Sequence, residues 1–193
     1  MRRYNPKIIE PKWQKIWNDT KIYEATEDTA RPKRYVLEYF PYPSGAAMHV
    51  GHVRNYTIGD AVARYSRMTG NNVLHPMGWD AFGLPAENYA IKSGISPQEA
   101  VAINVENFKA QLMQMGFSYD WSREINSTDP SYYKWTQWFF LLFFQKNLAY
   151  QRESLQWWCP HDKTVLAKEQ VEDGHCCRCG SLVEKKSIEK WFF

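Results

Sequence analysis

The first 158 residues of this chain contain no cysteine, and all four cysteines lie between residues 159 and 179. A secreted domain held together by disulfides would distribute its cysteines along the chain. Clustering instead favours metal binding in a reducing compartment.

Targeting and membrane-spanning segments are also lacking. No apolar stretch follows the charges of residues 1–6, which argues against a signal peptide. The most apolar run, residues 138–144, is far shorter than the ~20 residues that a membrane span needs. No internal repeat or low-complexity segment is visible. We therefore expect a soluble cytoplasmic protein.

The bulk composition is that of an ordinary globular chain. Its 193 residues are 44% hydrophobic and 23% charged, which fits roughly one domain. The net charge of +3 permits an anionic partner but does not demand one. Aromatic residues make up 16%, which predicts a rigid aromatic core or stacking surfaces.

Hydrophobic periodicity predicts an α/β fold. Apolar residues over 8–23 follow a helical period, with Pro11 expected in the first turn of that helix. A strand is expected over 35–40, a helix over 53–68 that ends at Gly70, and a second strand at 73–74. This order is a strand–helix–strand unit with a parallel sheet.

The second half of the chain contains more predicted elements. Ser96-Pro97-Gln98-Glu99 is a capping box that begins a helix, with Val101, Val105, Phe108, Leu112 and Met115 on one face. A helix that is apolar almost all round, and is therefore expected to be buried, runs from residue 129 to about 147. A strand over 150–158 then leads into a small cysteine-bearing structure over 159–183.

The stretch FPYPSGAAMHVGH, residues 40–52, places a glycine turn between a predicted strand and a predicted helix. The free amides and the dipole of a helix N-terminus form an anion site suited to phosphate. His49 and His52 share one face of the first turn and can donate hydrogen bonds to phosphate oxygens. The alternative is that both histidines cap the helix or fill the core.

Several motifs resemble one enzyme family. Pro41-Tyr42-Pro43-Ser44-Gly45 followed by His49-Val50-Gly51-His52 resembles the HIGH signature of class I aminoacyl-tRNA synthetases, with valine in place of isoleucine. GWDAFGLPAE at 78–87, GFSYDWSRE at 116–124 and WCP at 158–160 are similar to the leucyl-tRNA synthetase versions of the family's blocks. Isoleucyl enzymes carry a threonine-histidine pair where this chain has Ala81-Phe82. The resemblance covers essentially the whole chain.

This resemblance implies a Rossmann-like catalytic half-domain with a parallel sheet. It also implies a ligase that activates leucine with ATP to leucyl-adenylate and transfers it to tRNA(Leu), with Mg²⁺ on the phosphates. The residues it implies are catalytic His49 and His52; ATP-binding Ser44, Gly45, His49, Gly51 and His52; and leucine-binding Phe40, Tyr42 and Asp80.

Elementary chemistry supports part of this assignment. A buried substrate ammonium needs a carboxylate partner, and Asp80 is expected to follow a Gly-Trp turn after a strand. Tyr42 offers an apolar ring with a polar tip. The alternatives are that Asp80 caps a helix and that Tyr42 only packs. Glu87 is interpreted equally well as support for the site or as a solvated helix residue.

Zinc-knuckle-like spacing is found for Cys159 with His161 or Asp162, followed by Cys176 and Cys179, and tetrahedral zinc needs four ligands. The resemblance implies a zinc-binding insertion here, with cysteine or histidine at position 162, where this chain has Asp162. We expect His161 to replace it, so the predicted metal ligands are Cys159, His161, Cys176 and Cys179. His175 and Cys177 are spare candidates. The alternative is a degenerate knuckle held by packing of Trp157 and Trp158.

We expect three parts: an N-terminal helix and linker over 1–33, the half-domain over 34–157, and the zinc-knuckle-like element over 158–193, where an editing domain would begin. No KMSKS-like stretch is present. The prediction is therefore the N-terminal portion of a synthetase, with the C-terminal remainder in the same or a separate chain. The alternative is a non-catalytic, synthetase-derived module that binds tRNA or protein. A synthetase for another aliphatic amino acid is disfavoured by Ala81-Phe82.

Overall fold

The computed structural model describes residues 4–28, 30–45 and 47–193. The chain divides into two compact units, Met1–Tyr133 and Lys134–Phe193, each of which is described here by itself. The expected boundaries near residues 33 and 157 stay predictions. None of the helices in the described segments is long and apolar enough to cross a membrane.

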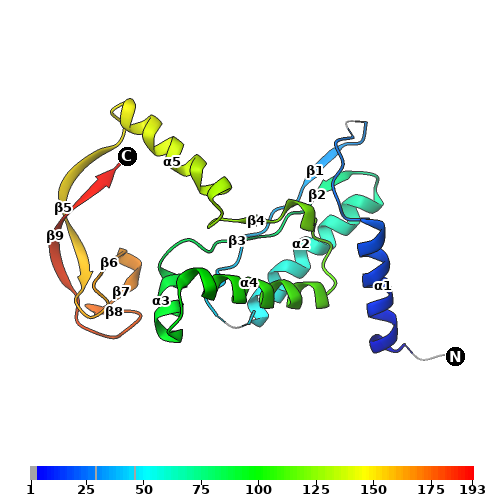
Figure 1. The fold of residues 1–193 in the computed structure, drawn as a ribbon, viewed down its shortest axis with the longest axis horizontal. Coiled ribbons are helices and arrows are strands. Elements are labelled where there is room, and N and C mark those ends of the chain that lie inside the picture. The colour runs from blue at the N-terminus through cyan, green and yellow to red at the C-terminus, as the bar shows by residue number, and fades with distance from the viewer. Residues whose placement is uncertain (1–3, 29, 46) are drawn as a thin grey trace. The chain divides into compact units, whose positions relative to one another are not determined.

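The first unit is an α/β structure (Figure 1). β1 pairs with β2 and β3 pairs with β4, and both pairs are parallel. The predicted strand–helix–strand unit is confirmed as β1, α2 and β2. The elements are α1 (Pro6–Thr20), β1 (Lys33–Tyr35), α2 (Val50–Met68), β2 (Asn72–Leu74), β3 (Gly78–Trp79), α3 (Leu84–Ser93), α4 (Pro97–Gln114), a 3₁₀ turn (Trp121–Arg123) and β4 (Ile125–Asn126).

Two expectations about the first elements differ from the structure. The first strand was expected over 35–40, but the β1 ladder covers 33–35, with one further bond from the Val36 amide to the Leu74 carbonyl at 3.0 Å. The partner strand β2 ends at Leu74, so the ladder stops there and residues 37–40 continue without strand pairing. Pro11 was expected in the first turn of its helix, which is wrong, because α1 begins at Pro6 and contains Pro11.

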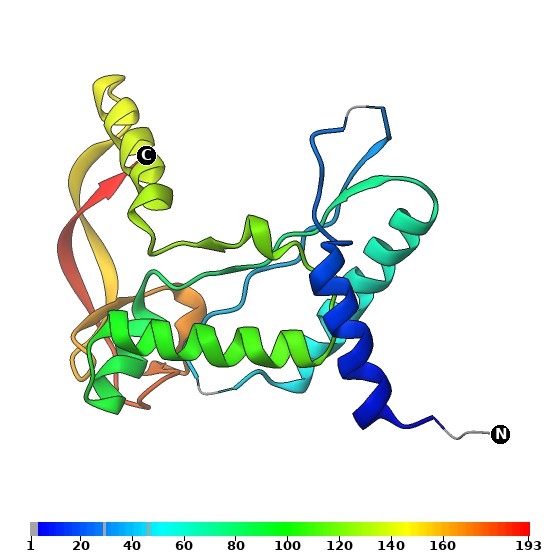
Figure 2. The same ribbon diagram turned by 45° about the vertical axis from the view of Figure 1, so that its right-hand side comes forward.

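α4 lies along the β3–β4 pair and covers the main core (Figure 2). Trp79 of β3 meets Phe108 of α4 edge to face, with ring centroids 6.4 Å apart. The predicted capping box is confirmed, since the Ser96 hydroxyl accepts the Glu99 amide hydrogen at 3.2 Å. The buried cluster consists of Tyr56, Met77, Trp79, Ala81, Ala86, Val101, Phe108, Leu112, Phe117 and Tyr119.

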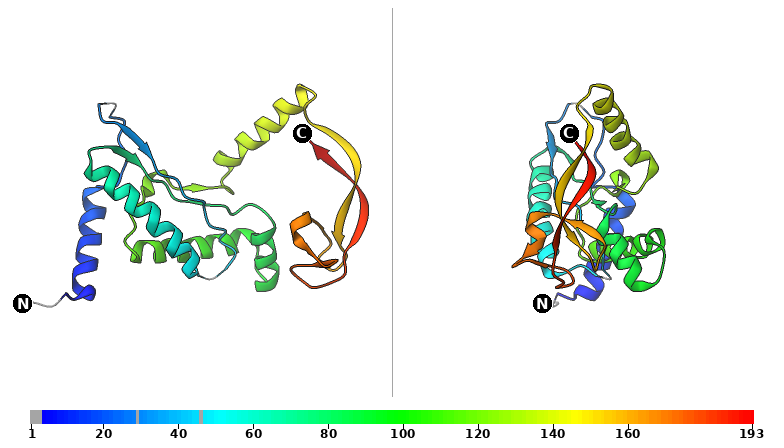
Figure 3. Two further views of the ribbon diagram at one scale, coloured as in Figure 1. Left: turned by 180° about the vertical axis from the view of Figure 1, so that it is seen from behind. Right: turned by 90° about the vertical axis from the view of Figure 1, so that its left-hand side faces the viewer.

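The second unit is built on a long two-stranded ribbon, β5 (Tyr150–Cys159) and β9 (Glu184–Phe192), which twists along its length (Figure 3). The strands are antiparallel and in register from Tyr150 opposite Phe192 to Trp158 opposite Glu184. Between them lie β6 (Thr164–Leu166), a 3₁₀ turn (Lys168–Gln170), β7 (Val171–Glu172) and β8 (His175–Cys176). A small core of Cys159, Leu166, Cys176 and Val183 closes this end of the ribbon.

α5 (Pro130–Gln145) forms where an apolar helix was predicted, but the expectation that it is buried is wrong. None of its residues is buried, and Trp135 and Phe139 are 57% and 52% exposed. Within the second unit, Trp191 of β9 contacts Phe140 and Phe144 edge to face. The helix therefore keeps much of its apolar surface exposed.

Candidate functional site

A pocket of about 580 Å³ opens in the first unit, at the ends of β3 and β4 and beside the start of α2. Four of the residues predicted from the sequence line it together: Phe40, Tyr42, His52 and Asp80. The other lining residues, none of which was predicted as a site residue, are Tyr39, Pro41, Trp79, Ile125, Ser127 and Tyr132.

Close backbone contacts build the walls of this pocket. A side chain at Gly78 would have its Cβ 2.7 Å from the Phe40 ring, so glycine lets that ring lie directly on β3. The Asp80 amide donates to the Pro41 carbonyl at 3.1 Å, which ties the carboxylate-bearing turn to the opposite wall. The Ser127 hydroxyl oxygen accepts the amide hydrogens of Ala81 and Phe82 at 2.8 and 3.0 Å.

Two side chains of α4 hold the loop that precedes α2. Asn104, which is 1% exposed, donates from Nδ2 to the Pro43 carbonyl at 2.9 Å. The Met48 amide donates to Oε1 of Gln111 at 3.0 Å. Sequence reasoning missed both residues. The available signal was a polar Asn104 three residues after Val101, on the apolar face of the helix.

The first turn of α2 arranges both histidines of the motif. His49 is the N-cap residue, and its amide donates to Nδ1 of His52 at 3.2 Å. The two rings lie with centroids 3.9 Å apart. A side chain at Gly51 would have its Cβ 2.9 Å from the His49 ring, so glycine makes room for that ring. Because Nδ1 of His52 accepts a hydrogen bond, Nε2 carries the proton of the neutral imidazole.

Electrostatics favour the neutral form of His52. Partial burial and then the nearby His49 lower the pKa of His52 below its ordinary value. The unpaired backbone amides of the first turn of a helix can donate hydrogen bonds to an anion. A neutral Nε2–H donor at a helix N-terminus can bind a phosphate oxygen without needing a second proton.

The remaining predicted ATP-binding residues do not line the pocket: Ser44, Gly45, His49 and Gly51. Ser44 and Gly45 are half-buried in the loop between Pro43 and α2. Glu87 is exposed in the first turn of α3, at a separate hollow that Asp80 does not line.

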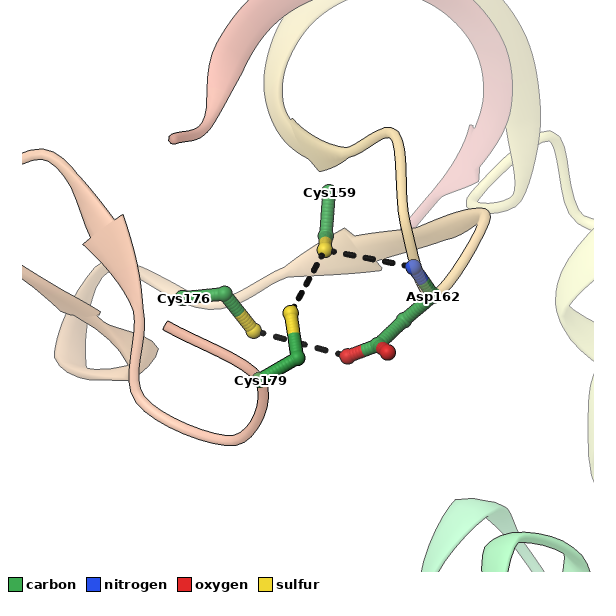
Figure 4. A group of neighbouring side chains, drawn as sticks. All are labelled: Cys159, Asp162, Cys176 and Cys179. Carbon is green, nitrogen blue, oxygen red and sulfur yellow. Dashed lines mark hydrogen bonds between the residues drawn. The ribbon is translucent and has the colours of Figure 1, made fainter. Parts of the chain in front are cut away.

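Three thiols and one carboxylate meet in the second unit: Cys159, Asp162, Cys176 and Cys179 (Figure 4). Their ligand atoms all lie within 4.8 Å of one another, and the Cys159 and Cys179 sulfurs are 3.4 Å apart. The Cys176 thiol donates to Oδ2 of Asp162 at 3.5 Å. Hydrogen bonds from Ser181 lower the pKa of Cys179 to about 7, which favours the thiolate that metals bind.

This donor set fits a tetrahedral metal ion. Bonds of about 2.3 Å to sulfur place tetrahedral ligands about 3.8 Å apart, close to the observed spacing. Asp162, rather than the predicted His161, completes the group, and the side chain of His161 is 69% exposed with Nδ1 3.0 Å from Oδ1 of Asp162. Cys177 is exposed and lies outside the group.

The chain matches the family described as tRNA synthetases class I (M) over residues 35–189. It is 56% identical over 192 residues to the leucine–tRNA ligase subunit alpha of Aquifex aeolicus. It is 61% identical over 184 residues to the leucine–tRNA ligase of Rickettsia felis. These matches cover 100% and 95% of this chain but only 30% and 22% of the relatives.

Two solved synthetase structures are also similar to this chain. LeuRS of Agrobacterium radiobacter K84, in a ternary complex with tRNA and LeuAMS, has a TM-score of 0.91 and 42% identity. That match covers 98% of this chain and 24% of the other. Methionyl-tRNA synthetase of Mycobacterium tuberculosis, in complex with methionyl-adenylate, has a TM-score of 0.68 at 23% identity, covering 84% of this chain and 32% of that one. The second match shows a likeness of fold.

Proposed function

We propose that this chain, which belongs to the class I tRNA synthetase family, forms the part of a leucine–tRNA ligase that binds leucine and ATP. The observation that carries the proposal is the single pocket in which Asp80, the aromatic wall and His52 meet. The similarity to leucine–tRNA ligases over the length of this chain supports leucine as the amino acid.

The residues of the pocket have complementary tasks in this reaction. The Asp80 carboxylate pairs with the ammonium of leucine, and Phe40 and Tyr42 line the space for its side chain. ATP lies with its phosphates toward His49, Gly51 and His52, and Ser44 and Gly45 complete that side. We expect Mg²⁺ to accompany ATP and to neutralise phosphate charge.

The chemical step needs no nucleophile from the protein. A carboxylate oxygen of leucine attacks the α-phosphorus of ATP, the bond from that phosphorus to the bridging oxygen breaks, and pyrophosphate leaves with the electron pair. Nε2–H of His52 donates to a phosphate oxygen as charge develops. Catalysis therefore consists of orientation and charge stabilisation.

Leucyl transfer to tRNA(Leu) requires more than these residues. Because the chain spans less than a third of the relatives' length, we infer that the remainder of a synthetase, in the same or a separate chain, supports that step.

Amino-acid-dependent ATP–pyrophosphate exchange, measured for all twenty amino acids with the rest of a leucine–tRNA ligase present, tests the proposal. Leucine should give the signal. His52→Ala should remove about 2–4 kcal/mol of transition-state stabilisation and so slow the exchange, with little change in leucine affinity. Asp80→Ala should mainly weaken leucine binding, by about 2–5 kcal/mol. Exchange with a different amino acid, or a His52→Ala rate within twofold of the parent, would refute the assignment.

We also propose that the cysteine group holds a structural zinc ion through Cys159, Asp162, Cys176 and Cys179. Protein prepared without chelators should contain about one equivalent of zinc, and Cys176→Ser should lower it. Cys177→Ser is the matched control, since Cys177 is exposed outside the group. Elemental analysis of Asp162→Ala and His161→Ala decides the fourth ligand. A greater zinc loss in His161→Ala than in Asp162→Ala would favour the histidine.

A further inference from the structure

A buried group of ionisable side chains in the first unit has no part in the chemistry described above. The side chain of Glu38 is 7% exposed, and His75 beside it is fully buried. Nε2 of His75 lies 3.2 Å from Oε2 of Glu38, and the Tyr119 hydroxyl donates to the same oxygen at 2.9 Å. Removing a carboxylate from water costs free energy unless hydrogen-bond partners compensate it, so we ask what the buried Glu38 does in the fold.

The hydrogen-bond partners fix the orientation of the His75 ring and of the Tyr119 hydroxyl. Nδ1 of His75 lies 3.2 Å from the Ser118 carbonyl oxygen, which can only accept, so Nδ1 carries a hydrogen. Nε2 faces the carboxyl of Glu38. Burial, and after it the charge of Glu38, raises the pKa of Tyr119 far above its ordinary value, so its hydroxyl stays protonated. Nε2 of His75 and the Tyr119 hydroxyl therefore hold the same carboxylate oxygen of Glu38 from two sides.

The second oxygen of Glu38 lies against α2. Oε1 is buried and has no hydrogen-bond partner in the described part of the chain. A Cβ at Gly59 of α2 would overlap this oxygen, so the carboxyl fills the space that this glycine leaves. Glu38 thereby sets the separation between α2 and the segment that continues into the pocket wall at Phe40.

Packed rings connect this group to His52. Tyr119 meets Tyr56 edge to face, with centroids 6.4 Å apart. Tyr56 is fully buried and stacks on the His52 ring at 5.9 Å and 28°. The Tyr56 hydroxyl also donates to the Tyr39 carbonyl at 3.3 Å, next to the pocket wall.

We infer that the Glu38–His75 pair is a positioning element that holds α2, and with it the imidazole of His52, at the phosphate side of the pocket. The role in catalysis rests on the proposed function, because it assumes that His52 acts on ATP. Neither Glu38 nor His75 lines the pocket. They act through Gly59 on one side and through Tyr119 and Tyr56 on the other.

The structural part of this inference can be tested without catalysis. The chain has five histidines, and histidine-selective NMR resolves the tautomer and environment of each ring. Glu38→Gln and His75→Gln should shift the His52 resonances. His161 and His175 lie in the second unit and are internal controls that should not move. Unchanged His52 resonances in both variants would overturn the inference, even if the protein proved to have no exchange activity.

The kinetic part uses the leucine-dependent exchange assay. Glu38→Gln and His75→Gln should lower kcat about 10–100-fold, the scale for a slightly misplaced catalytic group, with KM for leucine within twofold. Asn72→Ala is the matched control. This buried side chain binds Thr26 and Asp28, remote from the pocket, so its loss should lower Tm but leave kcat unchanged.

Equal losses of kcat in all three variants would reduce the pair to a stabilising role and overturn the inference. Tyr119→Phe covers the case in which Glu38→Gln and His75→Gln do not fold, because it removes one hydroxyl and keeps the ring. A fall in kcat of several-fold with unchanged KM for leucine supports the inference, and an unchanged kcat contradicts it. Failure of the parent protein to exchange would instead refute the proposed function.

Discussion

His52 illustrates how far the sequence specifies a single residue. The HIGH-like spacing predicts a histidine pair at a helix start, and the structure brings both rings together in the first turn of α2. The tautomer of His52 depends on a backbone amide that donates to Nδ1, which spacing alone does not predict. Glu38 was missed altogether, because a single carboxylate in a strand-like segment gives no sign that it will be buried.

Gly59 provides a test at the scale of one atom. Gly59→Ala would normally stabilise a helix by about 1 kcal/mol. Here the added Cβ meets the Glu38 carboxyl, and overpacking of this kind costs about 1–3 kcal/mol. We therefore expect net destabilisation in denaturant unfolding. The same substitution in a Glu38→Ala background should be neutral or stabilising, and equal effects in both backgrounds would contradict the close contact.

At the scale of elements, an N-cap residue in the sequence predicted the start of a helix well. Elements that depend on pairing with a distant segment were predicted less well. Ser96 marks the start of α4 as expected. The bounds of α3 were not predicted, because its N-cap residue, Gly83, makes no side-chain hydrogen bond. β9 was missed because charged residues occupy much of it, and its strand conformation comes from pairing with β5. Local sequence cannot reveal a pairing between segments that are some thirty residues apart.

The anchor from α4 to the pocket loop yields a prediction for that element. Asn104→Ala removes the donor to the Pro43 carbonyl, and an unpaired buried acceptor costs about 1–3 kcal/mol. We expect a loss of unfolding free energy in that range. Leucine binding should weaken with it, because the freed loop carries Tyr42. Glu106→Ala, exposed on the same helix, is the control, and equal effects of the two substitutions would exclude the anchoring role.

At the scale of the whole molecule, the main mismatch is between the hydrophobicity of α5 and its exposure. The apolar pattern predicted a buried helix, yet Trp138 and Phe144 are 50% and 52% exposed. Contiguous apolar surface of this kind marks an interaction site. The relatives are more than three times as long as the matched segment, so they contain residues that could cover such a helix. Periodicity predicts that a helix face will be covered but does not identify the segment that covers it.

This mismatch leads to a prediction about assembly. We expect the 193 residues alone to form leucyl-adenylate slowly, because they include neither a KMSKS-like loop nor the rest of the synthetase. Binding of leucine can survive such a loss better than stabilisation of the transition state can. Adding the remaining synthetase segments as a separate chain should raise pyrophosphate exchange by orders of magnitude. It should also bury α5, which a blue shift of tryptophan emission would report. Trp135→Phe and Trp138→Phe together should remove most of that shift and keep the gain in rate. Full activity of the isolated chain, or neither association nor a gain on mixing, would contradict the prediction. A gain in rate without the blue shift would show that α5 is not the surface that joins the two parts.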